Sequence, residues 1–280
     1  MAEPVVIDTI AAMRTRLADR PSIALVPTLG ALHDGHLALV ERAAELAETV
    51  VVSVFVNPLQ FGVNEDLAKY PRDLDADVQA LAGRGVAYVF APAVEQMYPE
   101  GKTEVTVTGG KVASLFEGRS RPGHFDGVLT VVAKLLNIVQ PQHVLFGQKD
   151  AQQLYLVQRM VRDLDIPTRV EVVETVRAED GVALSSRNRY LDADQRRAAR
   201  SLIRALEAAG SAADRGIDTV IASAQSVLMG EELVKLDYLK VVNPRTFLPV
   251  DDGYRGPARV LIAAQVGPAR LIDNEIIYLN

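Results

Sequence analysis

"SIALVPTLGALHDGHLALVERAAELAETVVVSVFVN", residues 22–57, decides the expected fold. An apolar run at 22–27 ends at a proline, a loop with Gly30 and Gly35 follows, and helical spacing extends to residue 48 before a second β-branched run at 49–57. Strand, loop, helix and strand in this order are typical of a parallel βαβ unit. Continuously apolar runs such as these are expected of strands that helices cover on both faces.

The same alternation continues to about residue 173. Three further runs rich in apolar and β-branched residues lie at 85–90, 143–147 and 168–175. Helical spacing marks the segments 35–48, 73–84, 125–140 and 151–164. In the third of these, one helix face carries Val128, Val132, Leu135, Leu136 and Val139. The sequence therefore predicts an α/β fold, a Rossmann-like doubly wound parallel sheet, over residues 1–175.

The pattern changes after about residue 175. A polar segment at 177–199 leads into an Ala-rich helix, and a second helix is expected around 217–229. Strand-like runs separated by proline and glycine follow at 235–242, 258–266 and 270–274. Helices grouped together and then strands grouped together are typical of an α+β arrangement. We expect a smaller C-terminal α+β domain at 176–280.

Composition narrows the class of protein. The 280-residue chain is 49% hydrophobic, which allows a substantial core. Its 30 basic and 36 acidic residues give a net charge of −6 without a basic stripe, which argues against nucleic-acid or anionic-membrane partners. The absence of cysteine excludes disulfides, thiolate zinc sites and a cysteine nucleophile. With no apolar stretch near the roughly 20 residues that cross a bilayer and no signal-peptide pattern, we expect a cytoplasmic protein.

In an open parallel sheet, ligands bind beyond the carboxyl ends of the strands, so the strand-to-loop junctions are the candidate sites. The first junction, "VPTLGALHDGH" at 26–36, places His33 and His36 at a helix entrance. The N–H groups and the dipole of a helix start favour an anion, and two imidazoles add donors for phosphate oxygens. Two alternatives stay open: His33 caps the helix with His36 half buried, or the pair chelates a metal. The metal alternative lacks the glutamate of a His-Glu-x-x-His helix and a nearby third ligand.

The first junction does not match the stricter patterns of other enzyme classes. It is neither G-x-x-x-x-G-K-[ST] nor G-x-G-x-x-G, which disfavours a P-loop enzyme and a dinucleotide dehydrogenase. The chain also has no serine in a G-x-S-x-G elbow. A phosphate cradle built from a helix start and two histidines is therefore the favoured interpretation.

The second junction, "FVNPLQFG" at 55–62, carries two amides just past a strand. Asn57 precedes a proline, where asparagine is commonly a turn former. Gln60 stands between Leu59 and Phe61. A neutral donor and acceptor among apolar neighbours suits a small polar ligand.

The third junction and one later loop carry positive charge. "FGQKDAQQ" at 146–153 puts Lys149 between a strand end and a helix start, where its ammonium can meet a phosphate. The alternative is a solvated lysine with Asp150 as the helix N-cap. "ALSSRNRY" at 183–190 combines hydroxyls and guanidinium groups in a loop that could close over a site, or simply leads into a helix.

Five blocks in this order resemble the pantothenate synthetase (pantoate–β-alanine ligase) family of the nucleotidylyltransferase superfamily. The blocks are "VPTLGALHDGH", "FVNPLQFG", "RPGHFDGVLTVVAKLLNIVQP", "FGQKDAQQL" and "LSSRNRYL", with "TIAAMR" and "LIDN" matching near the two ends. The resemblance implies that the carboxylate of pantoate attacks the α-phosphorus of ATP, giving pantoyl adenylate and pyrophosphate. The amine of β-alanine then displaces AMP to form pantothenate, on the route to coenzyme A. Such chemistry relies on positioning and charge stabilisation.

The resemblance also assigns roles to residues. It implies that His36 is a proton donor, with His33 and Lys149 completing the catalytic set. The implied ATP-binding residues are Leu29, Gly30, Ala31, Leu32, His33, Asp34, Gly35, His36, Gly147, Gln148, Lys149, Asp150, Val176, Leu184, Ser185, Ser186 and Arg187. Gln60 and Gln153 would bind pantoate, Gln60 would also contact β-alanine, and Asp77 would hold Mg²⁺ on the phosphates. The family further implies a homodimer, an ATP- and pantoate-binding domain at 1–175 and a lid domain at 176–280.

Some positions are less typical. Glu117 and Arg121 resemble family positions near ATP, yet each suits a surface charge equally. Leu29, Gln148 and Ala151 stand where the family often has Met, Glu and an aromatic residue, which concerns affinity more than reaction type. Two other functions stay open: a nucleotidylyltransferase that keeps the adenylyl group on its product, and a nucleotide-binding protein without catalysis. The paired glutamines and the boundary loop separate the ligase from both.

Overall fold

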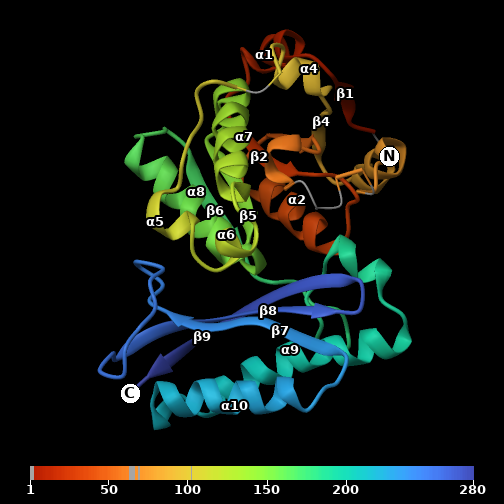
Figure 1. The fold of residues 1–280 in the computed structure, drawn as a ribbon. Helices are drawn as coiled ribbons and strands as arrows, with labels where there is room; N and C mark the ends of the chain where they lie inside the picture. Colours follow the sequence, from red (N-terminus) through yellow and green to blue (C-terminus); the bar gives the residue numbers. More distant parts are fainter. Residues whose placement is uncertain (1–2, 63–66, 69, 102) are drawn as a thin grey trace. The chain divides into compact units, whose positions relative to one another are not determined.

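The computed structural model describes residues 3–62, 67–68, 70–101 and 103–280 (Figure 1). The chain divides into two compact units. Unit 1 comprises Met1–Gln148 and Gln152–Glu174, and unit 2 comprises Lys149–Ala151 and Thr175–Asn280. The short segment Lys149–Ala151 therefore belongs with the C-terminal unit although it directly follows a strand of the first. The division of labour between an ATP- and pantoate-binding part and a lid stays a prediction.

Unit 1 is built on a six-stranded parallel sheet. The strands are β1 (Val5–Ile7), β2 (Ile23–Thr28), β3 (Thr49–Val54), β4 (Val86–Phe90), β5 (His143–Gly147) and β6 (Arg169–Val173). Their spatial order is β1-β4-β3-β2-β5-β6, so the direction of winding reverses between β2 and β5. This is a doubly wound Rossmann-like sheet with a short extra strand at one edge, and it confirms the predicted fold class.

Helices cover both faces of this sheet. Because alternate side chains of a strand point to opposite faces, Leu25 of β2 joins a core with α1 (Ile10–Leu17), α7 (His124–Val139) and α8 (Ala151–Asp163). Its neighbour Val26 joins a second core with α2 (Asp34–Leu46) and α3 (Leu74–Leu81). Burial on both faces explains why the strands are continuously apolar.

The remaining elements of unit 1 are short. They are α4 (Val94–Met97), α5 (Gly110–Ala113), α6 (Glu117–Ser120) and the 3-10 turns η1 (Pro58–Gln60) and η2 (Gln148–Asp150), the last of which continues into unit 2. The five predicted strands and four predicted helices of this part are all present. β1 and α1 were not predicted, and β1, with three residues, is too short to show a period. α7 is buried on more than the predicted face, since Leu129, Val131 and Ile138 are buried as well.

Unit 2 has an antiparallel sheet of β7 (Val234–Val242), β8 (Gly256–Val266) and β9 (Ala269–Leu279), with β8 in the middle. Two helices, α9 (Ala193–Ser211) and α10 (Ile217–Met229), lie against the sheet (Figure 1). The 3-10 turns η3 (Ser186–Tyr190) and η4 (Ala213–Arg215) flank α9. The predicted α+β arrangement is confirmed, with a third strand that runs five residues beyond the expected end at 274, to Leu279.

Within the described part of the chain, no helix combines the length and the apolar character that a bilayer crossing requires.

Candidate active site

Three of the predicted junctions leave the same edge of the unit 1 sheet. β3, β2 and β5 are neighbours and parallel, so the loops at their carboxyl ends start side by side. β2 and β5 also flank the point where the strand order reverses, which is where open α/β sheets bind ligands. The loop of residues 29–33 follows β2, η1 follows β3, and Gly147 with Gln148 ends β5. The topology therefore places a candidate ligand site at this edge.

The two histidines close the N-terminus of α2 as a reciprocal cap. His33 is the N-cap residue, and its Nδ1 accepts a hydrogen bond from the backbone N–H of Gly35 at 3.1 Å. The Nδ1 of His36 accepts from the backbone N–H of His33 at 3.3 Å. The ring centroids are 4.1 Å apart. The capping alternative considered for His33 is thus what the structure shows, with imidazoles in the places usually taken by Ser or Thr and Glu or Gln.

The cap fixes the tautomer of both rings. A backbone N–H can only donate, so each Nδ1 must be an unprotonated acceptor, and a neutral ring then carries its proton on Nε2. Each ring thereby acts as an N–H donor through Nε2 without first becoming an imidazolium. Capping and phosphate binding are compatible because they use different nitrogens of the same ring.

Asp77 anchors the loop that leads to these histidines. Its carboxylate is 4% exposed and accepts the backbone N–H of Ala31 at 3.0 Å and that of Leu32 at 2.8 Å. Gly30 and Ala31 both have left-handed backbone, with φ of +82° and +52°. Such a conformation costs free energy for an alanine and persists where surrounding contacts hold it. A Cβ at Gly30 would lie 2.8 Å from Asp77 Oδ2, so the close approach of the carboxylate requires glycine there.

The loop uses most of its own backbone donors internally. Besides the contacts to Asp77 and within the cap, the N–H of Gly30 donates to Thr28 Oγ1 at 3.1 Å, and the N–H of His36 donates to His33 O at 2.7 Å. Backbone N–H groups at this helix start were expected to bind an anion. The protein itself occupies most of these N–H groups, so the prediction that they bind an anion is left to the two imidazoles and the helix dipole.

The second junction is locked by Asn57. This side chain is completely buried, and its Oδ1 accepts from the N–H of Leu59 at 3.3 Å and from the hydroxyl of Tyr98 at 2.8 Å. Its Nδ2 donates to the carbonyl of Gly127 at 3.0 Å. Burial raises the pKa of the Tyr98 hydroxyl to about 12, so the phenol stays a donor. Asn57 is therefore the turn former anticipated from its place before proline, with two further contacts that sequence reasoning missed.

The turn η1 is held against the N-terminus of α7. The carbonyl of Gln60 accepts from His124 Nδ1 at 2.8 Å, and the guanidinium of Arg121 contacts both His124 Nε2 at 3.0 Å and the Gln60 carbonyl at 3.5 Å. A Cβ on Gly127 would lie 2.1 Å from the carbonyl oxygen of Leu59, so only glycine permits this approach. The main chain of Gln60 is thereby fixed, while Gln153 lies in the first turn of α8.

Glu117 and Arg121 prove to be tied into unit 1 rather than placed on an open surface. Glu117 is 7% exposed, and its backbone N–H donates to Gln152 Oε1 at 3.1 Å. Gln152 in turn donates to the carbonyls of Val112 at 2.8 Å and Leu115 at 2.9 Å. These contacts position α6 and the chain before it, and a role of either charge toward ATP stays a prediction.

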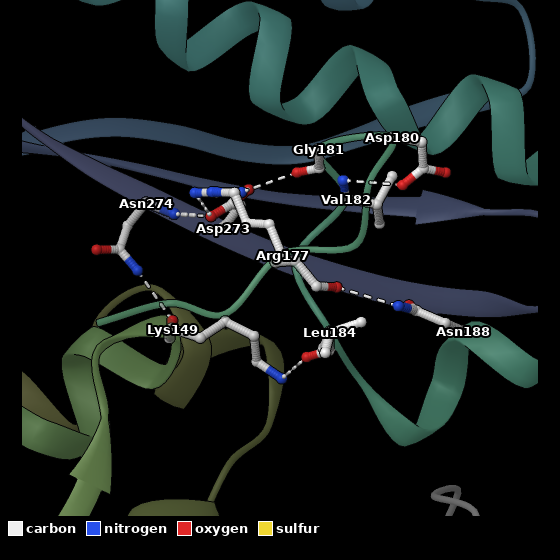
Figure 2. Close-up of polar contacts among 10 residues, drawn as sticks. Lys149, Arg177, Asp180, Gly181, Val182, Leu184, Asn188, Asp273 and Asn274 are labelled. Atoms are coloured by element: carbon white, nitrogen blue, oxygen red, sulfur yellow. Dashed lines mark hydrogen bonds and ion pairs between the residues drawn. The ribbon is translucent and has the colours of Figure 1, made fainter. Parts of the chain in front are cut away.

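Unit 2 contains the predicted lysine and the predicted hydroxyl-rich loop. Lys149 donates from Nζ to the carbonyl of Leu184 at 3.2 Å (Figure 2). Asp150 Oδ2 lies 3.9 Å from the same nitrogen. Leu184 pairs with Val176, whose carbonyl accepts the Leu184 N–H at 3.0 Å. Leu184 thus joins Lys149 and Val176, and all three are predicted ATP-binding residues.

The rest of the loop begins the next element. Ser185 caps η3 by accepting the N–H of Arg187 at 3.3 Å, and Ser186 and Arg187 lie within η3. Asn188 donates to the carbonyl of Ala183 at 3.0 Å (Figure 2). Residues 176–184 form a hairpin closed by the antiparallel bridge between Arg177 and Ala183. Hydrogen bonds from Arg196 lower the pKa of the Asp180 carboxyl and tie the tip of this hairpin to α9. Contacts of these residues with a ligand stay predictions.

The described residues contain no group of three or more His, Cys, Asp or Glu side chains that could hold a metal. The metal alternative for His33 and His36 therefore has no third ligand in that part of the chain. Asp77 as a magnesium ligand stays a prediction. Each of its oxygens accepts one backbone N–H, so its carboxylate already serves the loop.

A doubly wound parallel sheet with a capped helix entrance at its switch point is typical of α/β enzymes that bind nucleotides. Residues 5–276 match the family model for pantoate-beta-alanine ligase. Pantothenate synthetase from Leifsonia xyli subsp. xyli (strain CTCB07) is 56% identical over 274 residues, which cover 96% of this chain and 95% of that protein. The chain belongs to the pantoate–β-alanine ligase family, as the sequence blocks indicated.

Solved structures agree. Pantothenate synthetase from Thermus thermophilus superposes with a TM-score of 0.91 at 49% identity and covers 97% of this chain and 98% of its own. Pantoate-beta-alanine ligase from Francisella tularensis, complexed with beta-gamma ATP and beta-alanine, gives a TM-score of 0.81 at 32% identity, with 98% and 97% covered. The chain is accordingly an enzyme, a ligase that joins pantoate to β-alanine.

Proposed function

We propose that this chain carries out the condensation in two steps. In the first, a carboxylate oxygen of pantoate attacks the α-phosphorus of ATP, the bond to the β-phosphate oxygen breaks, and pyrophosphate leaves. In the second, the amine of β-alanine attacks the acyl carbon of pantoyl adenylate, the bond to the AMP oxygen breaks, and pantothenate forms. The observation that carries this proposal is the pair of capped imidazoles at the switch point, whose Nδ1 atoms accept backbone N–H groups and so leave Nε2 as the donor of a neutral ring.

The first step develops negative charge on the departing pyrophosphate. His33 and His36 would donate from Nε2 to its oxygens, and Lys149 would supply a compact positive charge. Of the two rings, we assign the proton donor role to His36, in the sense of a hydrogen bond from Nε2–H to the departing oxygen without transfer of the proton. Donors held in place before reaction stabilise charge without having to reorganise, and the reciprocal cap holds both rings in this way.

The remaining assignments follow the sequence expectations. The loop of residues 29–36, Gly147 to Asp150, Val176 and residues 184–187 would contact ATP, with residues 184–187 closing as part of a lid. Gln60 and Gln153 would grip pantoate, and Gln60 would also meet β-alanine. The fixed main chain of Gln60 supports that role, because a side chain that orients a small polar substrate needs a rigid base.

Magnesium, a cytoplasmic location and a homodimer are part of the proposal. Mg²⁺ usually takes one or two protein carboxylates together with substrate phosphates, and Asp77 of α3, beside the loop of residues 29–33, would supply one. When bound, Mg²⁺ would neutralise phosphate charge. Light scattering coupled to size-exclusion chromatography tests the dimer, which should elute at twice the mass of the 30.4 kDa chain.

Isotope exchange tests the proposed reaction. The protein should catalyse exchange of labelled pyrophosphate into ATP only when pantoate is present, and it should form AMP only after β-alanine is added. AMP formation without pantoate, or exchange with no dependence on pantoate, would contradict the two-step scheme. Stable adenylylation of a product in place of AMP release would favour a nucleotidylyltransferase.

A further inference from the structure

Two consecutive buried residues of β9 contact the two segments of unit 2 that contain predicted ATP-binding residues. These segments are Lys149 with its neighbours and the hairpin of residues 176–184. Asp273 is 4% exposed and Asn274 is 3% exposed. They end the "LIDN" block, to which the sequence assigned no role. Figure 2 shows Asp273 directed to the hairpin that contains Arg177, and Asn274 directed to Lys149. Buried polar side chains are costly unless they are well bonded, so their partners are informative.

Asn274 holds the main chain of Lys149. Its Nδ2 donates to the carbonyl of Lys149 at 2.9 Å, across 125 residues of sequence. Its Oδ1 accepts from the guanidinium of Arg259 on β8. Because Arg259 can only donate, the amide must point its oxygen toward Arg259 and its NH₂ toward Lys149. An amide is therefore required here, and a carboxylate of the same shape would set oxygen against the Lys149 carbonyl oxygen.

Asp273 holds the hairpin that receives the Lys149 ammonium. Its carboxylate binds Arg177 through two hydrogen bonds, of 2.7 Å and 3.0 Å, and accepts the backbone N–H of Asn274 at 2.8 Å. Burial alone would lower the pKa of Arg177, but the hydrogen bonds and charge of Asp273 outweigh it and raise that pKa. Arg177 also donates to the Gly181 carbonyl at 3.2 Å, and it bridges Ala183 in the hairpin.

The two contacts together determine where the Lys149 charge lies. Asn274 fixes the start of the side chain, and the hairpin held by Asp273 offers the Leu184 carbonyl to Nζ. The Leu184 carbonyl is neutral, so it orients the ammonium without cancelling its charge. The half-exposed Asp150 carboxylate is 3.9 Å from Nζ, beyond hydrogen-bond distance, and an ammonium has two further N–H donors for other partners. A displacement of about 1 Å in such a group can cost on the order of 100-fold in rate.

We propose that Asp273 and Asn274 are positioning residues for adenylate formation, acting through Lys149 and the Val176–Leu184 hairpin rather than by touching substrate. The proposal rests on the proposed role of Lys149 in the first step. It goes further because it states that two residues of β9 fix the position in which Lys149 acts.

The main test compares the two half-reactions of Asn274→Asp. Pantoate-dependent pyrophosphate exchange should fall about 10- to 100-fold. Aminolysis of added pantoyl adenylate by β-alanine, which involves no departing pyrophosphate, should keep more than half its rate. A merely structural role would lower both in proportion, because both would follow the folded fraction. Equal losses, or no loss, would overturn the proposal.

Two further variants keep the test decisive. In a Lys149→Ala background, Asn274→Asp should change exchange less than twofold, because its effect passes through the lysine that is gone. If Lys149→Ala itself leaves exchange unchanged, the proposed role of Lys149 has failed rather than the positioning. Asp273→Asn should raise the KM for ATP while the KM for pantoate stays constant. This measurement tests the proposal even if the Asn274→Asp protein folds poorly. An unchanged KM for ATP would count against Asp273.

Asn243→Asp is the matched control. Asn243 lies in the same unit, and its Oδ1 accepts the N–H of Arg245 at 2.8 Å. A carboxylate keeps that acceptor, so this variant should leave both half-reactions unchanged. A comparable loss in Asn243→Asp would show that added negative charge in unit 2, and not the contact to Lys149, slows exchange.

Discussion

Residues 29–36 of unit 1, the histidine loop, and Lys149 of unit 2 have comparable expected roles toward phosphate. They are held in place by different kinds of contact. The histidine cap is local, because its partners lie within three residues of one another. Lys149 depends on Leu184 and Asn274, which lie 35 and 125 residues away. Local contacts form with the helix that they cap, whereas remote contacts need the whole unit folded. Substitutions distant in sequence should therefore act on Lys149 directly, whereas they reach the histidine rings only through the preceding loop, which Asp77 anchors.

The largest expected effect comes from removing one donor in each region. His36→Ala and Lys149→Ala should each slow pantoate-dependent exchange by about two orders of magnitude or more, since each removes a group that stabilises developing charge. His36→Gln separates catalysis from capping, because glutamine keeps a capping-box acceptor and lacks the imidazole. Lys111→Ala, at an exposed lysine, is the control. Near-normal exchange in a folded His36→Gln or Lys149→Ala protein would refute that assignment.

Gly127→Ala should strongly disturb the turn η1, which contains Gln60. The new Cβ would meet the Leu59 carbonyl at 2.1 Å, so either α7 or η1 must move, at a cost of about 1–3 kcal/mol in the free energy of unfolding. The KM for pantoate should rise, because Gln60 moves with η1. Gly210→Ala in α9, where the nearest atom would lie at 3.8 Å, should be neutral or stabilising. Thermal unfolding and substrate kinetics should be measured for both variants. Unchanged stability and KM in Gly127→Ala would contradict the close packing of Gly127 against the Leu59 carbonyl.

Asp77→Asn distinguishes a loop anchor from a magnesium ligand. An asparagine oxygen can accept only on one side, so its NH₂ would face either the Ala31 or the Leu32 N–H. Exchange should fall about tenfold or more as the histidine loop loses its place. Asp75→Asn, on the exposed side of the same first turn, removes the same charge without this contact. Recovery of the Asp77→Asn rate at raised magnesium would identify a ligand, whereas a persistent loss supports the anchor.

Tyr98→Phe should have the smallest effect and a distinct pH dependence. It removes one donor to Asn57, at a cost of about 1 kcal/mol. The folded pKa of about 12 lies above the unfolded value, so the stabilisation is fully present below the unfolded pKa of about 10 and is lost as the pH rises through the folded pKa. The free energy of unfolding, measured with denaturant between those pH values, should therefore fall less steeply for the variant than for the parent chain. Parallel curves would contradict a buried, neutral phenol.

Much of the fold could be predicted because its signals are periodic and local. The βαβ alternation, the strand ends and the histidine pair all follow from short stretches of sequence, and they predicted the sheet, the site edge and the family. Periodicity says nothing about contacts between distant residues. Asp77 reaches a loop 45 and 46 residues earlier, Asn57 meets Tyr98 and Gly127, and Asn274 meets Lys149. The sequence indicated a turn for Asn57 and a metal for Asp77 and assigned nothing to Asn274, and only burial with a bonded partner reveals these long-range contacts.

The anchored loop before α2 has a thermodynamic consequence for ligand binding. Ala31 and Leu32 are bonded to Asp77, and both imidazoles are already oriented by their own cap. Binding of a triphosphate to such a surface immobilises few additional torsions, so little conformational entropy is lost on the protein side. Calorimetry of Asp77→Asn should show this directly: weaker nucleotide binding that arises mainly from a less favourable entropy, because the loop must then be ordered by the ligand itself.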